Sequence, residues 1–550
     1  MSTTHRTLLI GIVTLFLLVR IPALHLSYYQ DEFKSVAAAE TSLAAANSFF
    51  THPPLTALLL RSDAIVFGGS GMRVLPLLFG LLSVGLLFAV VRRRFDTTTA
   101  LWSAALYTVS FYGIWASLMV DTDGAILPTL FLAAVYCYDR LRGHTDQMYR
   151  WGILLALAVL TGLFVKLSFV LVPAALILDF FLERRRLFRL PRVSAIGFGL
   201  LGLGIVLVLA VLLVRLALPA FQFGGMIAHA RAYMHLTDRN YLQVLVQGVK
   251  AVYYLSPLLL VPLLFLTRDL LWRARVFATY LVLGFVFYFI LFDFSRGALD
   301  KYLMFTIVPL AVLAGSVFGQ VSVRSLQFPR LWVGAGAVAA ALVVAAAFLP
   351  QTVVPLYPKS AWFLSVLHGR LNVLTPFNGG SGPLGFYVSF LVIFLGYLTA
   401  LSAAVLGRVA LRFRHGALLV VLLAGLAYNA VFWEEFAFGK IHGSASVVLQ
   451  DSLAFIGQRS DIGQVLTYND IGAYELVKMG KYAGRFYAAP QFEAGHAQLF
   501  AAYEGAYLVV GVPPLYDGFY SRFFSQCASV FQTRSGVILS TIYTCQKTKK

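Results

Sequence analysis

The sequence predicts a polytopic α-helical membrane protein of about thirteen transmembrane helices with a C-terminal extracytoplasmic α/β domain. Hydrophobic residues make up 59% of the 550 residues, charged residues only 12%, and the mean hydropathy is +0.80. The apolar residues gather in runs of about 15–20, the length that crosses a hydrocarbon core. Beyond about residue 434 these long runs stop, which predicts a separate folded segment there.

The apolar runs define the helical part, residues 1–433. The first run follows a short basic N-terminus, as a signal peptide would, but no small-residue cleavage site follows it, so we expect a retained helix. The two runs that meet at Lys166 are each short, and one long helix is the alternative. The expected runs are Leu8–Ala23, Val74–Val91, Ala100–Ser117, Ala125–Tyr138, Trp151–Val165, Leu167–Leu182, Val193–Pro219, Val249–Leu266, Val276–Phe292, Leu303–Val321, Leu331–Pro350, Gly385–Leu406 and Ala417–Phe432.

Basic clusters predict the orientation of these runs. The formal net charge of +19 would favour nucleic-acid binding in a soluble chain. Here the arginines lie between apolar runs, so topology explains them and we expect no nucleic-acid partner. A cluster follows every even-numbered run, which places those loops and the N-terminus in the cytoplasm and favours the split at Lys166. The clusters are Arg92–Arg94, Arg140–Arg150, Arg184–Arg192, Arg268–Arg275, Arg324–Arg330 and Arg408–Arg414.

An odd number of crossings leaves the C-terminal segment outside. We therefore expect a multi-pass protein with an extracytoplasmic, or periplasmic, C-terminal domain. The high ratio of arginine to lysine and the absence of retention signals favour the bacterial inner membrane over the endoplasmic reticulum of a eukaryote. The first outside loop, about residues 24–73, is too long for a simple connector. Its stretches Glu40–Phe50 and Leu55–Phe67 are typical of helices that lie in the interface plane.

The C-terminal segment, residues 434–550, shows the short alternating pattern of strands. We expect Asp470 to cap a helix, with acceptor binding as the alternative. Cys527 and Cys545 could form a disulfide outside the cytoplasm, the alternative being two buried thiols. The expected elements are strands at Val465–Tyr468, Arg485–Ala488, Tyr507–Val512 and Val537–Thr544, and a helix near Ile471–Met479.

Acidic residues occur in two successive outside loops. Asp31 and Glu32 follow the first run, and Asp121 and Asp123 lie in the next outside loop. Acidic residues at span ends are rare without a function, although a solvated loop is the alternative for the first pair. These four are our candidate catalytic residues. The first loop also supplies three candidates for contact with the substrate or acceptor: His52, Tyr28 and Tyr29.

Basic residues on the same predicted face suggest an anion site. Outside cations depart from the usual charge bias, and a lipid phosphate would account for them. Pairing with Asp293 or Asp300 is the alternative. The candidates for binding the donor phosphate are Lys301, Tyr302, Arg296 and Lys166.

The acidic and basic sets together favour glycosyl transfer from a polyprenyl phosphate. A carboxylate takes the acceptor proton, and cations stabilise the departing phosphate. Because phosphate leaves without a strong acid, one base suffices, unlike the carboxyl pair of a hydrolase. A transporter or flippase is the alternative, but transporters usually carry internal repeats and midplane charges. A non-catalytic scaffold would leave the acidic and basic sets unexplained.

The order of these motifs, over about residues 8–320, resembles the GT-C superfamily of glycosyltransferases, in the protein mannosyltransferase-like branch (glycosyltransferase family 39 and aminoarabinose transferase-like enzymes). The resemblance implies an inverting transferase that uses dolichyl- or undecaprenyl-phosphate sugars, with Asp31 as the base and Lys301 and Tyr302 at the phosphate. The motifs are Asp31-Glu32, His52-Pro53-Pro54-Leu55, Asp121-Thr122-Asp123-Gly124, the segment 162–167, and Lys301-Tyr302 leading into Pro309.

The resemblance leaves the cofactor, sugar and acceptor open. No cofactor is expected to be required, and a divalent metal is an option because some superfamily members use one. The expected partners are the polyprenyl-phosphate sugar donor, membrane lipids and an acceptor that is a lipid, a glycan or a protein. Metal ligands, if used, would come from Asp31, Glu32, His52, Asp121 and Asp123.

Overall fold

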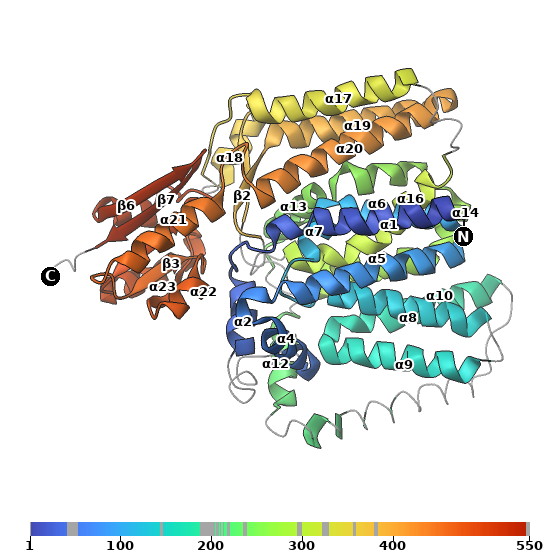
Figure 1. Ribbon diagram of the computed structural model, residues 1–550, viewed down its shortest axis with the longest axis horizontal. Helices are drawn as coiled ribbons and strands as arrows, with labels where there is room; N and C mark the ends of the chain where they lie inside the picture. The colour runs from blue at the N-terminus through green and yellow to red at the C-terminus, as the bar shows by residue number, and fades with distance from the viewer. Residues whose placement is uncertain are drawn as a thin grey trace.

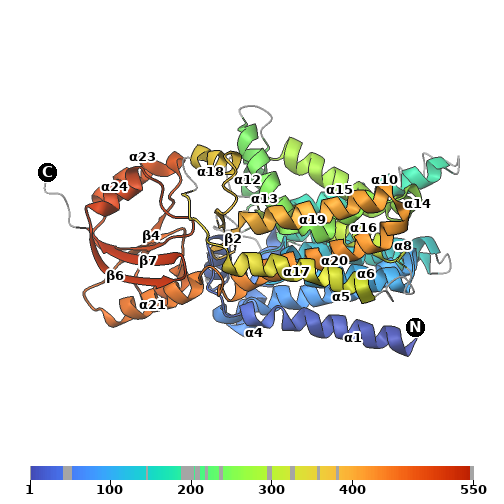
Figure 2. The same cartoon turned by 90° about the horizontal axis from the view of Figure 1, so that it is seen from above.

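The computed structural model describes residues 2–545 except 41–52, 144–146, 187–203, 205–207, 209–210, 213, 217–220, 235–238, 294–299, 322–328, 356–358 and 379–382. Long helices lie side by side in a bundle, and a mixed α/β unit caps one end of it (Figures 1 and 2). The N-terminus lies at the opposite end of the bundle from this unit (Figure 1).

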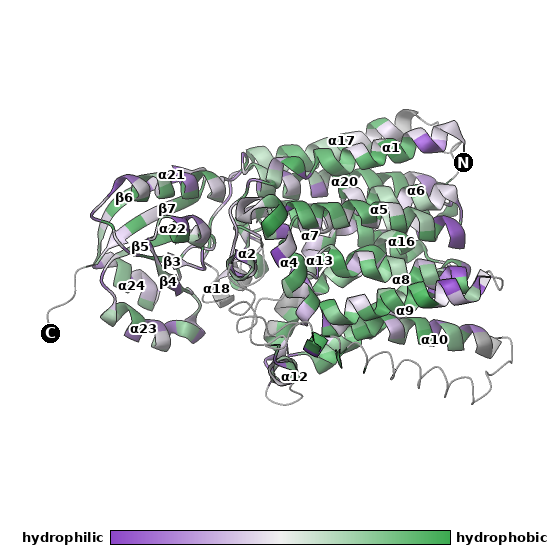
Figure 3. Ribbon diagram, turned by 60° about the horizontal axis from the view of Figure 1, so that its bottom comes forward, coloured by the Kyte–Doolittle hydropathy of each residue, from purple (hydrophilic) through white to green (hydrophobic). Residues whose placement is uncertain are grey.

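The bundle helices are apolar along their length, and polar residues gather at their ends (Figure 3). Asp96 caps α6, and Ser110 caps α7, so the expected run Ala100–Ser117 is broken in the middle. The bundle contains α1 Thr3–Leu18, α5 Val74–Arg94, α6 Thr97–Val109, α7 Phe111–Ala116, α8 Ile126–Gly143, α9 Met148–Val165, α10 Leu171–Arg186, α13 Tyr241–Leu260, α14 Arg268–Arg273, α15 Arg275–Val286, α16 Ile307–Phe318, α17 Pro329–Phe348, α19 Phe390–Val409 and α20 Arg414–Ala437.

The chain is a multi-pass membrane protein, and seven helices among the described residues are long and apolar enough to cross a membrane. Two shorter apolar helices, Arg275–Leu291 and Trp332–Phe348, accompany them. The expected run Val193–Pro219 lies largely outside the described residues. The count of about thirteen therefore stays a prediction. The seven are Thr3–Ala23, Gly69–Arg94, Met148–Val165, Gly248–Phe265, Lys301–Phe318, Phe390–Val409 and Leu411–Ala437.

The break at Lys166 is confirmed. Helix α9 ends at Val165, Lys166 has an extended backbone (φ −156°, ψ 135°), and a short 3-10 helix, η3 Leu167–Val170, leads into α10. The extended residue turns the chain, so the Lys166 side chain lies at a helix end and is not in the middle of a long span.

Helices of the first loop lie at the bundle end that faces the α/β unit (Figure 1). They are α2 Asp31–Glu40 and α4 Pro54–Phe67, so the expected helix at Leu55–Phe67 is present one residue longer. The expected stretch Glu40–Phe50 falls almost entirely outside the described residues. Further short elements outside the main bundle are α12 Phe223–Ala232, α18 Lys359–Leu367, η7 Asp300–Thr306 and the hairpin β1 Leu374–Phe377 with β2 Phe386–Ser389.

The C-terminal unit is a five-stranded mixed sheet flanked by helices, with strand order β4-β3-β5-β7-β6. Strands β4, β3 and β5 are parallel, β7 pairs antiparallel with β5, and the edge strand β6 pairs antiparallel with β7. Cys527 and Cys545 form the expected disulfide across the open end of the β6–β7 hairpin. The elements are α21 Ala445–Gln458, β3 Val465–Tyr468, α22 Ala473–Lys478, β4 Tyr482–Phe486, α23 Glu493–Ala502, β5 Ala506–Val510, α24 Phe519–Ser525, β6 Ala528–Ser535 and β7 Ile538–Thr544.

Two details of the sequence prediction are wrong in this unit. Strand β4 begins at Tyr482 and ends at Phe486, earlier than the expected Arg485–Ala488. Asp470 does not cap α22, because Gly472 occupies the cap position and makes no side-chain cap bond. The Asp470 carboxylate instead accepts hydrogen bonds from Tyr482 and Arg485, which ties the turn after β3 to the edge strand β4.

Candidate active site

The candidate site forms where three chain segments meet at the bundle end nearest the C-terminal unit. Asp31 begins α2, Asp121 and Asp123 lie in the loop between α7 and α8, and Lys301 lies in η7 before α16. The sequence predicted that these residues share one face, and the structure brings them into direct contact. Lys301 Nζ lies 3.0 Å from Asp31 Oδ2 and 2.6 Å from Asp121 Oδ2.

A second ion pair lies beside the first. The Lys166 ammonium group pairs with the Asp123 carboxylate, and both side chains are buried. Both lysines lie near the Tyr302 ring, with its centroid 4.7 Å from Lys166 Nζ and 5.3 Å from Lys301 Nζ. Two ammonium groups and one phenol therefore lie close together, a combination that can bind the oxygens of a phosphate.

Asp31 is ionised in this setting. Burial alone would raise the pKa of its carboxyl, but the ammonium groups of Lys301 and Lys34 outweigh burial and hold the pKa below its ordinary value. Lys34 Nζ lies 2.9 Å from Asp31 Oδ1, and the Asp31 side chain is 31% exposed. A charged and partly accessible carboxylate is the state that a general base requires.

Glu32 points away from Asp31 into the protein. Its two oxygens lie 2.5 and 2.9 Å from the two terminal nitrogens of Arg73, and the backbone N–H of Val120 donates to it at 3.1 Å. Arg73 also donates to the carbonyl oxygens of Leu118, Leu26 and Ser27. This geometry favours a positioning role for Glu32, which joins α2 to the start of α5 and to the Asp121 loop.

Tyr28 and Tyr29, our candidates for substrate contact, are both buried. The Tyr28 hydroxyl donates to the Gly69 carbonyl, and its ring meets Tyr474 of the C-terminal unit edge to face at 5.2 Å. Their packing supports the contact between the bundle and the C-terminal unit, and substrate contact stays a prediction for both. His52 and Arg296 lie outside the described residues.

The His52-Pro53-Pro54-Leu55 motif leads into α4, which is fixed to the lysine region. The Thr56 hydroxyl donates to the Val165 carbonyl at 2.5 Å, one residue before Lys166. In the described part of the chain, no group of three or more His, Cys, Asp or Glu side chains could hold a metal ion. Because His52 is not described, the metal option stays open.

Two participants were missed from the sequence. Arg73 stands alone at the outside end of a run, and this break in the charge bias could have singled it out. The second is His229 of α12: burial lowers the pKa of its imidazole, and the Lys166 ammonium group lowers it further. No local signal identifies His229, since α12 reaches the site only through the fold.

Comparison with known proteins supports the sequence resemblance. The family described as "Dolichyl-phosphate-mannose-protein mannosyltransferase" matches residues 51–214. A search of curated proteins finds no match.

Two solved structures share the fold along almost the whole chain. ArnT from Cupriavidus metallidurans bound to undecaprenyl phosphate matches with a TM-score of 0.57 and 15% identity, covering 98% of each chain. The same protein in the apo state matches with a TM-score of 0.52 and 15% identity, covering 97% of each chain.

Proposed function

Because the chain has the GT-C fold of ArnT, we propose that it is an integral-membrane glycosyltransferase that uses a polyprenyl-phosphate sugar donor. The observation that carries this proposal is that the Lys301 ammonium group contacts the carboxylates of both Asp31 and Asp121. A base and a phosphate-binding group must lie within one sugar ring of each other, and this contact satisfies that requirement.

The reaction we propose is a single displacement with inversion at the anomeric carbon. Asp31 takes the proton from an acceptor hydroxyl or amine as that atom forms its bond to the anomeric carbon. The bond from that carbon to the phosphate oxygen breaks, and its electron pair stays on the phosphate. Lys301 and Lys166 stabilise the charge that develops there, and the Tyr302 hydroxyl donates to it.

Donor binding, in this proposal, also frees the base. Lys301 cannot hold two carboxylates and a phosphate equally well, so an arriving phosphate weakens its contact with Asp31. The carboxylate then becomes more basic at the moment when an acceptor must be deprotonated. The pairing in the structure supports this sequence because both carboxylates contact the same ammonium group.

The location follows from the same proposal. We propose a bacterial inner-membrane enzyme with a cytoplasmic N-terminus and a periplasmic C-terminal unit. The opposite placement of the two along the bundle supports this topology, as does the disulfide, which forms in oxidising compartments (Figure 1).

The test is transfer by the purified protein. Radiolabelled undecaprenyl-phosphate aminoarabinose and polyprenyl-phosphate mannose would be offered with bacterial envelope lipids, glycans and proteins as acceptors. We expect labelled product with one lipid donor and none with Asp31→Asn. Transfer from a nucleotide sugar alone would overturn the proposal.

A further inference from the structure

The residue before Asp31 has an unusual backbone. Gln30 has φ 39°, in the left-handed region that residues other than glycine rarely adopt. Such a conformation is strained and persists only where its surroundings hold it. Gln30 is also buried. Contacts with other parts of the protein must therefore hold the Gln30 backbone in this conformation, directly before α2 begins.

The C-terminal unit supplies a polar contact at this point. The side-chain amide of Gln30 donates to the Tyr487 hydroxyl at 3.1 Å. Tyr487 directly follows β4, the edge strand of the sheet, and its sequence separation from Gln30 is 457 residues. Two aromatic pairs flank this bond, Tyr28 with Tyr474 and Phe33 with Tyr482, at 5.2 and 5.5 Å between ring centroids.

Tyr487 is itself fixed within the C-terminal unit. The Arg485 guanidinium carbon lies 5.2 Å from the centroid of its ring, and the Phe492 ring lies 4.9 Å away. Arg485 donates to Asp470 at 2.6 Å, and Asp470 is fully buried. Asp470 lies in a turn where Asn469, Asp470 and Gly472 all have positive φ (55°, 59° and 74°). These contacts within the C-terminal unit thus hold the Tyr487 side chain in place.

The aromatic pairs and the polar bond have different consequences for Asp31. Packing of Tyr28 and Phe33 sets the position of α2, but ring contacts tolerate rotation of the chain between them. A hydrogen bond to the residue preceding Asp31 limits that rotation. Burial raises the pKa of the Tyr487 phenol, and the charges of Asp470 and, less strongly, Asp31 add to this rise.

We propose that Tyr487 is a positioning residue of the transfer reaction, and that its bond to Gln30 fixes the direction of the Asp31 carboxylate. The C-terminal unit thereby completes the catalytic geometry of the bundle. This inference rests on the proposed transferase function and adds a residue of the α/β unit to it.

The test is Tyr487→Phe, which removes the hydroxyl and keeps the ring that packs on Arg485 and Phe492. Tyr503→Phe is the matched control, because its hydroxyl donates to the Ala506 carbonyl in the same unit. We expect Tyr487→Phe to lower kcat about 10–100-fold, as small misplacements of a catalytic group do. The acceptor KM, the binding of undecaprenyl phosphate and the melting temperature should stay near those of Tyr503→Phe.

A double-mutant cycle separates positioning from general damage. Gln30→Met removes the amide, so the double variant with Tyr487→Phe should be no slower than the worse single variant. Additive losses in kcat, or an unchanged kcat in Tyr487→Phe, would overturn the inference. The proposed function would still stand in that case, provided that the unmutated protein transfers the sugar. A wild-type protein that transfers neither lipid-linked sugar would remove the function and this inference with it.

Discussion

Lys301 Nζ lies 3.0 Å from Asp31 Oδ2, so the group proposed to bind phosphate and the group proposed to act as base are in direct contact. This contact neutralises both groups in the same structure. Replacing either residue therefore also changes the electrostatic surroundings of the other, so donor binding and the transfer rate have to be measured separately for each variant.

Asp31→Asn should abolish transfer. The amide cannot accept the acceptor's proton, and the loss of a general base costs about 10²–10⁴-fold in rate. The measurement is kcat with the lipid-linked donor, beside the melting temperature of the purified protein. Asp517→Asn, an exposed change in the C-terminal unit, is the control and should keep its rate. Substantial activity in Asp31→Asn would refute the assignment of the base.

Lys301→Ala should weaken binding of undecaprenyl phosphate. A charge-assisted hydrogen bond contributes about 1.5–3 kcal/mol, so Kd should rise by roughly one to two orders of magnitude. Fluorescence titration of the purified protein measures it. Lys440→Ala removes an exposed ammonium group beyond α20 and should leave Kd unchanged. An unaltered Kd in Lys301→Ala would exclude Lys301 from the phosphate site.

The pH profile should depend on Lys34. Its ammonium group helps to hold the pKa of the Asp31 carboxyl below the ordinary value. The base is therefore active above that depressed pKa and is lost as pH falls through it. Lys34→Gln should raise the pKa and move the acidic limb of kcat/KM to higher pH. An unmoved limb would mean that another group controls the acidic side of the profile.

Arg73→Met should destabilise the protein. It leaves the buried Glu32 carboxylate without its bidentate partner, and breaking a buried pair in this way costs about 3–5 kcal/mol. The double change Arg73→Met with Glu32→Met removes both charges and should recover part of the loss. Melting temperatures of the single and double variants in detergent would show it. Equal destabilisation in both would contradict a paired role.

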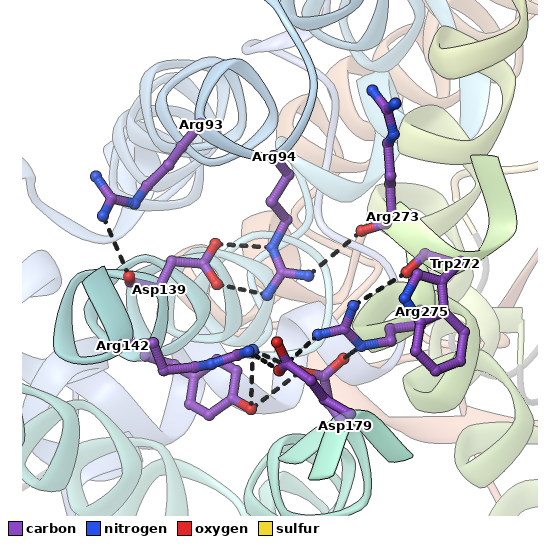
Figure 4. A network of polar contacts seen from close by, with 10 residues as sticks. Arg93, Arg94, Asp139, Arg142, Asp179, Trp272, Arg273 and Arg275 are labelled. Atoms are coloured by element: carbon purple, nitrogen blue, oxygen red, sulfur yellow. Dashed lines mark hydrogen bonds and ion pairs between the residues drawn. The ribbon is translucent and has the colours of Figure 1, made fainter. Parts of the chain in front are cut away.

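Asp179→Asn should destabilise the far end of the bundle without affecting donor binding. Asp179 of α10 is fully buried and pairs with Arg275 at 2.8 Å and with Arg142 at 3.3 Å (Figure 4). Arg94 and Asp139 form a neighbouring pair that ties α5 to α8 (Figure 4). Arg142 and Arg275 also pair with Glu183, so loss of the Asp179 charge leaves this one carboxylate against two arginines. The melting temperature should therefore fall while Kd for undecaprenyl phosphate stays constant. A change in that Kd would contradict the prediction, because it would mean that the Asp179 ion pairs influence donor binding at the other end of the bundle.

The sequence predicted features that follow from composition and local pattern. Hydropathy located most of the long helices that the structure describes, and alternation located three of the strands closely. The gathering of Asp31, Asp121 and Lys301 was predictable because charge bias assigns each loop to a side of the membrane. Strand β6 was missed because it is an edge strand with half-exposed, mostly polar residues, so no apolar alternation marks it.

Contacts between distant segments could not be predicted in the same way. The partner of Glu32 is Arg73, and the partner of Gln30 is Tyr487, yet each is one of many arginines or tyrosines in the chain. A single sequence does not show which arginine or tyrosine is the partner, because the pairing depends on how the helices and the sheet pack in three dimensions.

The bond between Gln30 and Tyr487 also bears on when the protein becomes active during its synthesis. The first loop and every bundle helix up to α20 leave the ribosome before Tyr487 is made. A nascent or prematurely terminated chain would carry both lysines and the carboxylates, but not the residue that orients Asp31. Under our inference, such a chain consumes lipid-linked sugar far more slowly, and full activity begins only after the C-terminal unit has been made and has folded against the bundle.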